Sequence, residues 1–182
     1  MTDKILLILD IDETLLHATK QHLGRDSDFS LFGYHVYRRP FLDEFLTECD
    51  RHFHLGVWSS SSDDYAEEII RRIFPGHIKP LFVWGRSRCT YAVNWEDNNF
   101  EYQKVLKKLK KRGFTLERIL IVDDTPAKVK RNYGNAIYMS EFTGDPADEE
   151  LRLLARYLHR LKDVENVRTI EKRFWREEII GD

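Results

Sequence analysis

The stretch Ile5-Leu6-Leu7-Ile8-Leu9-Asp10-Ile11-Asp12-Glu13-Thr14-Leu15-Leu16 decides the fold class of this chain. Its five consecutive apolar residues predict a strand that is buried on both faces, as strands of parallel sheets are. Because side chains two apart on a strand point the same way, Asp10 and Asp12 should project together from its carboxyl end. Open α/β sheets bind ligands at that end, and two close carboxylates attract a cation. The stretch therefore predicts a hard divalent ion, Mg²⁺, at this strand end.

Further apolar runs predict the other strands of the same sheet. These runs cover residues 55–58, 119–122 and 136–139, with a shorter run at 80–84. Apolar residues at helical spacing predict helices over residues 41–51, 63–74, 102–112 and 149–161. Strands that alternate with helices indicate an α/β fold with a doubly wound, mainly parallel, Rossmann-like sheet.

Two stretches interrupt this alternation, and each follows a predicted strand. Residues 19–39 are polar at first and then alternate at Tyr34-His35-Val36-Tyr37, which predicts a short β-hairpin flap. Residues 85–100 are expected to form a loop. Both stretches could frame a site at the strand ends.

The composition is that of an ordinary globular protein of one domain, with 182 residues, 42% hydrophobic and 33% charged. The formal net charge of −2 provides no global field that would attract nucleic acid or a membrane. No apolar run approaches the ~20 residues of a membrane helix, and we expect no leader before the first strand. Cys49 and Cys89 form no zinc pattern and fit reduced thiols. We therefore expect a cytoplasmic protein, or a nuclear one if the source is eukaryotic.

A second pair of carboxylates, Asp123 and Asp124, follows the predicted strand at residues 119–122. Thr125 can cap the next helix, and Pro126 suits the first position of that helix. Two acidic strand ends at one edge of a parallel sheet strengthen the prediction of a metal site.

Serines follow the predicted strand at residues 55–58, in the run Ser59-Ser60-Ser61-Ser62. Ser61 or Ser62 is expected to cap the helix over residues 63–74. Hydroxyls and backbone N–H groups at a helix start bind phosphate. A basic residue between this run and Asp123 is expected to neutralise the remaining phosphate charge.

Several motifs, in this order, resemble those of haloacid-dehalogenase-type phosphatases. Asp10-Ile11-Asp12-Glu13-Thr14-Leu15 resembles the DxDxT motif, and its DxDETL form resembles the FCP1/SCP-like (NLI-interacting-factor-like) branch. Residues 39–46 resemble the RPxxxEFL segment of that branch, residues 58–61 take the place of motif II, and residues 121–126 resemble motif IV. We therefore expect a phosphatase domain over residues 1–162 and a helical extension over 163–182 that packs on it.

The resemblance implies a two-step reaction through an aspartyl-phosphate. Asp10 would be the nucleophile, and Asp12 would protonate the leaving oxygen and later deprotonate the attacking water. The backbone carbonyl of Asp12 would also bind Mg²⁺, and Thr14 would fix the Asp12 loop. The implied metal-binding residues are Asp10, Asp12, Asp123 and Asp124, and the implied phosphate-binding residues are Thr14, Ser59, Ser60 and Lys104.

The catalytic lysine of motif III is assigned by resemblance of residues 102–106 to the V-K-x-L segment of the family, which selects Lys104. Helical spacing suggests an alternative. Lys104, Lys107, Lys108 and Lys111 recur at intervals typical of a solvated helix face. In the first turn of a helix, however, the long side chain of Lys104 could reach beyond the helix end. Both interpretations stay open at this point.

Neither irregular stretch leaves room for the cap domain that many of these phosphatases carry, so we expect an open site. An open site suits a phosphorylated residue of a macromolecule. We predict a Mg²⁺-dependent phosphatase of phosphoserine or phosphothreonine in a protein or peptide. The alternatives are a phosphatase of a small metabolite or nucleic-acid end, and a non-catalytic binding module of the same fold. We expect no membrane partner and see no clear nucleic-acid surface, and the sequence does not indicate an oligomeric state.

Three further features allow two interpretations each. Arg39 could assist the site or form a surface ion pair. His52 and His54 could bind a metal, although structural histidines are more common at a strand start. The aromatic residues could line a peptide groove or cover the protein's own core. These aromatic residues are Phe29, Phe32, Tyr34, Tyr37 and Trp95.

Overall fold

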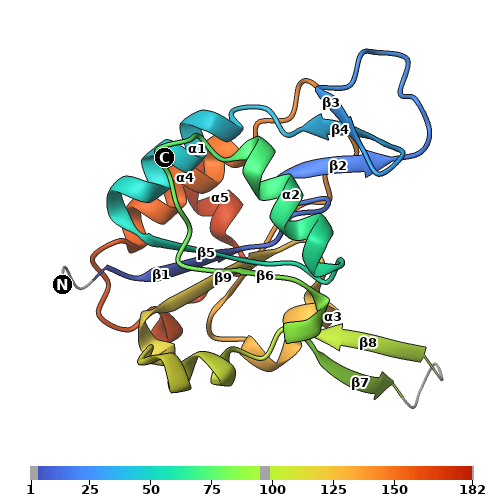
Figure 1. The fold of residues 1–182 in the computed structure, drawn as a ribbon. Coiled ribbons are helices and arrows are strands. Elements are labelled where there is room, and N and C mark those ends of the chain that lie inside the picture. Colours follow the sequence, from blue (N-terminus) through green and yellow to red (C-terminus); the bar gives the residue numbers. More distant parts are fainter. Residues whose placement is uncertain (1–3, 95–98, 182) are drawn as a thin grey trace.

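A five-stranded parallel sheet forms the centre of the computed structural model, which describes residues 4–94 and 99–181. Its strands are β1 (Leu6–Leu9), β5 (His54–Trp58), β6 (Val83–Trp84), β9 (Ile119–Asp123) and β10 (Ala136–Tyr138). They lie in the order β10-β9-β1-β5-β6, so the chain winds outward in both directions from β1. Helices and turns cover both faces of the sheet (Figure 1). The predicted doubly wound α/β fold is confirmed.

The side chains of β1 alternate between two cores, one on each face of the sheet. Leu7 and Leu9 pack into the larger core, whereas Leu6 and Ile8 pack into the smaller one. Four helices cover the larger core: α1 (Leu42–His52), α2 (Asp63–Ile73), α4 (Glu150–Leu161) and α5 (Trp175–Ile180). Because both faces are covered, β1 is apolar throughout and then ends abruptly in carboxylates.

Residues with a preference for helix N-termini mark where α2 and α3 (Pro126–Val129) begin at the edge of the sheet. The Oγ of Ser62 accepts a hydrogen bond from the Tyr65 N–H at 3.4 Å, so Ser62 is the N-cap of α2. Pro126 occupies the first turn of α3, as predicted. Thr125 occupies the predicted N-cap position of α3, but its side chain makes no capping hydrogen bond, because its hydroxyl donates to Asp124.

The predicted flap is a three-stranded antiparallel sheet instead of a single hairpin. It consists of β2 (Leu16–Thr19), β3 (Phe29–Leu31) and β4 (Tyr34–Arg38), in the order β2-β4-β3. Its tight turn at Phe32-Gly33 has positive φ at both positions, which favours glycine at the second. Figure 1 shows this sheet beyond the carboxyl ends of the central strands. Residues 4–94 and 99–181 contain no separate domain inserted over that edge.

The expected loop over residues 85–100 contains regular structure. A single 3₁₀ turn covers Arg86–Arg88, and a β-hairpin follows, formed by β7 (Thr90–Asn94) and β8 (Asn99–Gln103). Residues 95–98, and with them the aromatic candidate Trp95, lie outside the described residues. This hairpin projects below the flap in Figure 1, at the same end of the sheet.

The predicted helix over residues 102–112 is wrong. Residues 102 and 103 are instead the last residues of β8, and 3₁₀ turns cover Leu106–Arg112. Leu106 and Leu109 are buried three residues apart, which suits the three-residue period of a 3₁₀ helix. The Leu106 N–H donates to Oδ1 of Asn132 at 3.1 Å instead of to a preceding helical turn. A tertiary contact therefore replaces the helix start that the apolar spacing predicted.

The C-terminal residues lie against the sheet. After a 3₁₀ turn at Val167–Thr169, α5 buries Trp175 completely, and its indole N–H donates to the Tyr138 carbonyl at 2.9 Å. None of the helices in the described part of the chain is both long and apolar enough to cross a membrane.

Candidate active site

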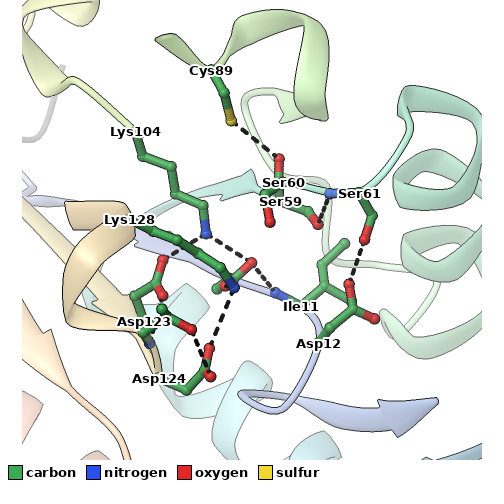
Figure 2. Close-up of polar contacts among 12 residues, drawn as sticks. Ile11, Asp12, Ser59, Ser60, Ser61, Cys89, Lys104, Asp123, Asp124 and Lys128 are labelled. Atoms are coloured by element: carbon green, nitrogen blue, oxygen red, sulfur yellow. Dashed lines mark hydrogen bonds and ion pairs between the residues drawn. The ribbon is translucent and has the colours of Figure 1, made fainter. Parts of the chain in front are cut away.

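The carboxyl ends of three neighbouring strands bring the predicted site residues together (Figure 2). Asp10 and Asp12 follow β1, Ser59 to Ser61 follow β5, and Asp123 and Asp124 lie at the end of β9. The Asp10 N–H continues the parallel ladder by donating to the Val122 carbonyl at 3.0 Å. The register of β1 and β9 therefore fixes how the two acidic strand ends meet.

Asp10 is buried between two lysines. Its Oδ1 lies 2.8 Å from Nζ of Lys104 and accepts from the Ile11 N–H at 2.8 Å, and its Oδ2 lies 3.5 Å from Nζ of Lys128. Burial acts to raise the pKa of Asp10, but the two ammonium groups outweigh it and hold the pKa below its ordinary value. Asp10 is therefore ionised, as a nucleophile must be.

Lys104 is completely buried, so the solvated-face interpretation is wrong for this residue. It directly follows β8 and precedes the 3₁₀ turns at Leu106–Arg112, whereas Lys107, Lys108 and Lys111 are exposed. The Lys104 Nζ lies 2.8 Å from Oδ1 of Asp10 and 2.6 Å from Oδ2 of Asp123. Burial acts to lower its pKa, but Asp10 and Asp123 raise it, which keeps Lys104 charged. Lys104 thus joins the two acidic strand ends.

Both carboxylate oxygens of Asp12 are held by hydroxyl donors from the start of α2 and the turn before it. The Tyr65 hydroxyl donates to Oδ1 at 2.6 Å, and the Ser61 hydroxyl donates to Oδ2 at 2.8 Å. Burial, together with the charge of Asp10, raises the pKa of Asp12 despite these hydrogen bonds. Asp12 therefore holds a proton more readily than Asp10, although the two are separated by one residue.

The acidic group at the metal position consists of Asp10, Asp123 and Asp124, whose carboxylate oxygens lie within 4.8 Å of one another. Oδ1 of Asp124 is buried without a hydrogen-bond donor, and the nearest cation, Lys128 Nζ, is 3.8 Å away. A carboxylate oxygen that accepts no hydrogen bond, beside an ionised carboxylate, suits Mg²⁺. The donor set therefore fits this ion.

Asp123 differs from Asp124, because both of its oxygens are occupied. Oδ1 accepts from the Thr125 N–H at 2.9 Å, and Oδ2 faces Lys104. Burial and the neighbouring Asp10 raise the pKa of Asp123. Of the two predicted ligands after β9, Asp124 is thus the one that is free to bind a cation directly, and Asp123 orients Lys104.

The structure places the three predicted phosphate-binding hydroxyl residues differently. Ser59 is buried, and its Oγ accepts from the Ser61 N–H at 3.0 Å, so it shapes the turn. Ser60 lines the cleft described below. Thr14 is completely buried and is not among the residues that line the cleft, and its Oγ1 forms no hydrogen bond with the part of the chain that the structure describes.

A cleft of about 490 Å³ opens above Asp12, between the flap and the start of α2. Phe32 and Tyr34 of the flap line it, whereas Tyr37 is buried in the core. The cleft is lined by Asp12, Glu13, Ala18, Phe32, Tyr34, Ser60, Ser61, Ser62, Tyr65, Arg86 and Lys128. A larger hollow of about 750 Å³ lies between α1 and α4, away from the carboxylates, and is lined by residues of those helices.

Sequence reasoning missed Lys128 and Tyr65. Lys128 lies on α3, four residues after Asp124, so helical spacing could have shown that it shares a face with that carboxylate. Tyr65 looked like part of the apolar face of α2, and nothing local indicates that its hydroxyl reaches Asp12. Its role becomes visible only when β1 and α2 are placed side by side.

Arg39 forms a buried ion pair, so the surface interpretation is wrong. Its Nε and Nη2 donate to the two oxygens of Asp148 at 2.8 Å each, and its Nη1 donates to the Thr14 carbonyl at 3.1 Å. The side chain is completely buried. Arg39 thus stabilises the loop that carries Asp12 through its hydrogen bond to the Thr14 carbonyl.

His52 lies far from the strand ends, in a surface group with Glu48 and His159. Its Nε2 is 3.1 Å from Oε1 of Glu48, while Arg51 and Lys162 contact other atoms of the group at 2.9 and 3.3 Å. With cations already on both sides, these residues join α1 to α4 as an ion-pair cluster.

A family model and two curated proteins that resemble this chain agree on one family. The model of the NLI interacting factor-like phosphatase family matches residues 5–168. The CTD small phosphatase-like protein 2 of Dictyostelium discoideum is 31% identical over 172 residues, covering 91% of this chain and 29% of that protein. The carboxy-terminal domain RNA polymerase II polypeptide A small phosphatase 1 of Homo sapiens is 26% identical, covering 93% of this chain and 64% of that protein.

A solved structure shares the fold. Fcp1, an essential RNA polymerase II CTD phosphatase, matches with a TM-score of 0.65 at 15% identity, covering 92% of this chain and 69% of that chain. At this identity the match concerns the fold alone. The chain spans less than two thirds of the length of either curated relative named above.

Proposed function

The chain belongs to the NLI interacting factor-like phosphatases, of the haloacid-dehalogenase fold family. We propose that it is a Mg²⁺-dependent phosphomonoesterase. The observation that carries the proposal is the position of Asp10. This ionised carboxylate is buried against Lys104 and lies beside Oδ1 of Asp124, to which no hydrogen-bond donor is directed among the described residues. Such an arrangement suits attack on a phosphoryl group whose charge is neutralised from two sides.

In the first step, a carboxylate oxygen of Asp10 forms a bond to phosphorus, and the bond between phosphorus and the ester oxygen breaks. Asp12 gives its proton to the departing oxygen, which leaves as an alcohol. In the second step, Asp12 removes a proton from a water molecule whose oxygen attacks the same phosphorus. The bond to Asp10 breaks, inorganic phosphate leaves, and both carboxyl groups return to their starting states.

The opposite environments of the two carboxyl groups support this division of roles. Two ammonium groups contact the Asp10 carboxylate, whereas two hydroxyl groups hold the Asp12 carboxylate. Lys104 would hold a phosphoryl oxygen while remaining paired with Asp123. Mg²⁺, held by Asp10, Asp124 and the Asp12 carbonyl, would supply further positive charge against the phosphoryl oxygens.

The proposed substrate is phosphoserine or phosphothreonine in a protein. The cleft is bordered by the flap and α2 and is not enclosed by a further domain within the described residues, so it can admit a residue of a longer chain. The name of the human relative describes a phosphatase of the RNA polymerase II carboxy-terminal domain. The alternative substrates are a phosphorylated small metabolite and a phosphorylated nucleic-acid end.

The proposal is tested with Asp10→Asn, which keeps the shape of the side chain and removes the nucleophilic charge. Hydrolysis of p-nitrophenyl phosphate should be Mg²⁺-dependent in the wild type and at background in the variant, with unchanged circular dichroism. Asp163→Asn, at an exposed position, is the matched control and should keep full activity. If Asp10→Asn hydrolyses p-nitrophenyl phosphate as fast as the wild type, Asp10 is not the nucleophile. If the wild type itself does not hydrolyse this substrate, the proposed phosphatase activity is wrong.

A further inference from the structure

One segment of the chain carries an excess of positive charge that the rest of the molecule lacks. Residues 85–116 contain eight Lys and Arg but only three Asp and Glu, a net charge of +5. The remaining residues therefore have a net charge of −7, since the whole chain has −2. The near-neutral total hides a strong separation of charge.

Four cations of this segment form a continuous surface that starts at the cleft. Arg86 lines the cleft, and its Nε donates to the Ser60 carbonyl at 2.9 Å. The guanidinium groups of Arg88 and Arg112 each lie 5.6 Å from the ring centre of Trp84. Lys108 donates from Nζ to the Arg88 carbonyl at 2.7 Å. We call the exposed residues Arg86, Arg88, Lys108 and Arg112 the basic stripe.

The described residues supply no carboxylate to neutralise the charges of the basic stripe. Across residues 4–94 and 99–181, no member of the stripe pairs with a carboxylate. The contacts that hold them are carbonyl oxygens and aromatic faces, which position a cation without cancelling its charge. By contrast, the exposed Lys130 outside the stripe pairs with Glu101 at 2.8 Å. The basic stripe therefore presents positive charge without a carboxylate partner among the described residues, and through Arg86 it reaches the cleft that Asp12 also lines.

We infer that the basic stripe binds the part of the substrate that flanks the phosphorylated residue, and that this part is an acidic peptide. The inference rests on the proposed function, because the stripe leads out of the cleft where the phosphorylated residue would bind. Four unpaired cations favour Asp, Glu or further phosphorylated residues, and they accelerate encounter with such a chain.

An anionic oligonucleotide fits this surface less well. Proteins that bind single strands usually offer aromatic faces on which bases stack. On the neighbouring hairpin, Tyr91 and Phe100 stack on each other, with ring centres 4.9 Å apart, and Arg86 covers the ring of Tyr102. Tyr91 and Phe100 each stay more than half exposed, but the ring within the stripe itself, Trp84, is already covered by Arg88 and Arg112.

The test compares two phosphoserine peptides of equal length, one with Glu and one with Lys on both sides of the phosphoserine. The KM of the Glu peptide should be about tenfold lower at 50 mM NaCl, and the difference should shrink strongly at 500 mM because salt screens exposed charges. A 5′-phosphorylated oligonucleotide forms the third arm, and p-nitrophenyl phosphate, which has no flanking chain, is the reference substrate.

The double variant Arg88→Glu with Lys108→Glu tests the surface itself. The ratio of its KM for the Glu peptide to its KM for p-nitrophenyl phosphate should rise about tenfold or more. Arg152→Glu with Arg156→Glu, on the exposed face of α4, changes the net charge equally and should leave this ratio unchanged.

Each outcome decides one question. Equal KM values for the two peptides, or equal ratios in the two double variants, would overturn the inference while the phosphatase activity stands. Preference for the oligonucleotide, lost in the stripe variant, would overturn the peptide assignment. A wild type that hydrolyses none of the substrates, p-nitrophenyl phosphate included, would overturn the proposed function and this inference with it.

Discussion

The phenol of Tyr65 donates a 2.6 Å hydrogen bond to Oδ1 of Asp12, which joins the first turn of α2 to the loop after β1. Ser61 holds the other oxygen of the same carboxylate at 2.8 Å. Asp12 is therefore fixed in orientation before any substrate arrives. A proton donor held in this way needs no reorganisation at the moment of reaction.

Tyr65→Phe removes one of these two donors without changing the ring that packs on the flap. We expect kcat for p-nitrophenyl phosphate to fall about tenfold, because the hydrogen bond that orients Asp12 corresponds to about 1–1.5 kcal/mol. Tyr133→Phe is the control, since its exposed hydroxyl contacts only Glu171, at 3.3 Å. Equal kcat in both variants would contradict a role for Tyr65 in orienting Asp12.

Lys128→Gln removes a cation that lies 3.5 Å from Asp10 and 3.8 Å from Asp124. Since this ammonium opposes a second cation at the same carboxylates, we expect Mg²⁺ to bind about tenfold more tightly to the variant in calorimetric titration. Lys130→Gln loses the same charge two residues later, where the lysine pairs with Glu101, and should bind Mg²⁺ like the wild type. Weaker binding to Lys128→Gln would show that the lysine does not compete with the ion.

Arg39→Met breaks the buried ion pair with Asp148 and withdraws the donor from the Thr14 carbonyl. The free energy of unfolding should fall by about 3 kcal/mol in urea denaturation, because Arg39 is completely buried and Asp148, whose side chain is only 16% exposed, loses its cation. The neighbouring Arg38 provides the control, since its ion pair with Asp43 is partly exposed. Arg38→Met should cost at most about 1 kcal/mol. Similar losses in both variants would contradict the special position of Arg39.

Lys172 gives the stability a dependence on pH. It is buried, with its Nζ donating to the carbonyls of Val167 and Ile170, and burial lowers its pKa from 10.5 to about 8. Between these values the folded protein releases the proton before the unfolded chain does. Lys172 therefore adds stability as the pH rises from about 8 towards 10.5, and this stability is lost as the pH falls through 8.

The measurement compares the wild type with Lys172→Met in urea denaturation at pH 7 and pH 10. The difference in unfolding free energy should move in favour of the wild type by up to about 3 kcal/mol at the higher pH. A difference that is the same at both pH values would contradict the lowered pKa.

Much of the fold could be predicted because short-range patterns report burial. The apolar runs at β1 and β9 are buried on both faces, and their carboxyl ends carry the acidic pairs that the sequence placed there. The apolar spacing of α2 and α4 likewise matches their buried faces. The same reasoning failed at residues 102–112, where Asn132 bonds the Leu106 N–H and a strand precedes the 3₁₀ turns.

The candidate site also contains residues that could be predicted from the sequence and residues that could not. Asp10, Asp12 and Asp124 could be assigned from the sequence, because a strand end and a shared sheet edge place them. Of the residues that surround these carboxylates, Lys104 could be selected only through the family resemblance, and Lys128 and Tyr65 were missed. All three come from separate segments whose approach depends on packing.

By itself, then, the sequence determined which strands are buried and which carboxylates stand at their ends, because backbone periodicity and burial are local properties. Only the tertiary structure decided which ions and hydroxyls meet those carboxylates. Arg39 and Asp148 lie 109 residues apart in the chain, and Asp10 and Lys128 lie 118 apart. Such contacts form when separate elements pack together, and no local pattern of residues records them.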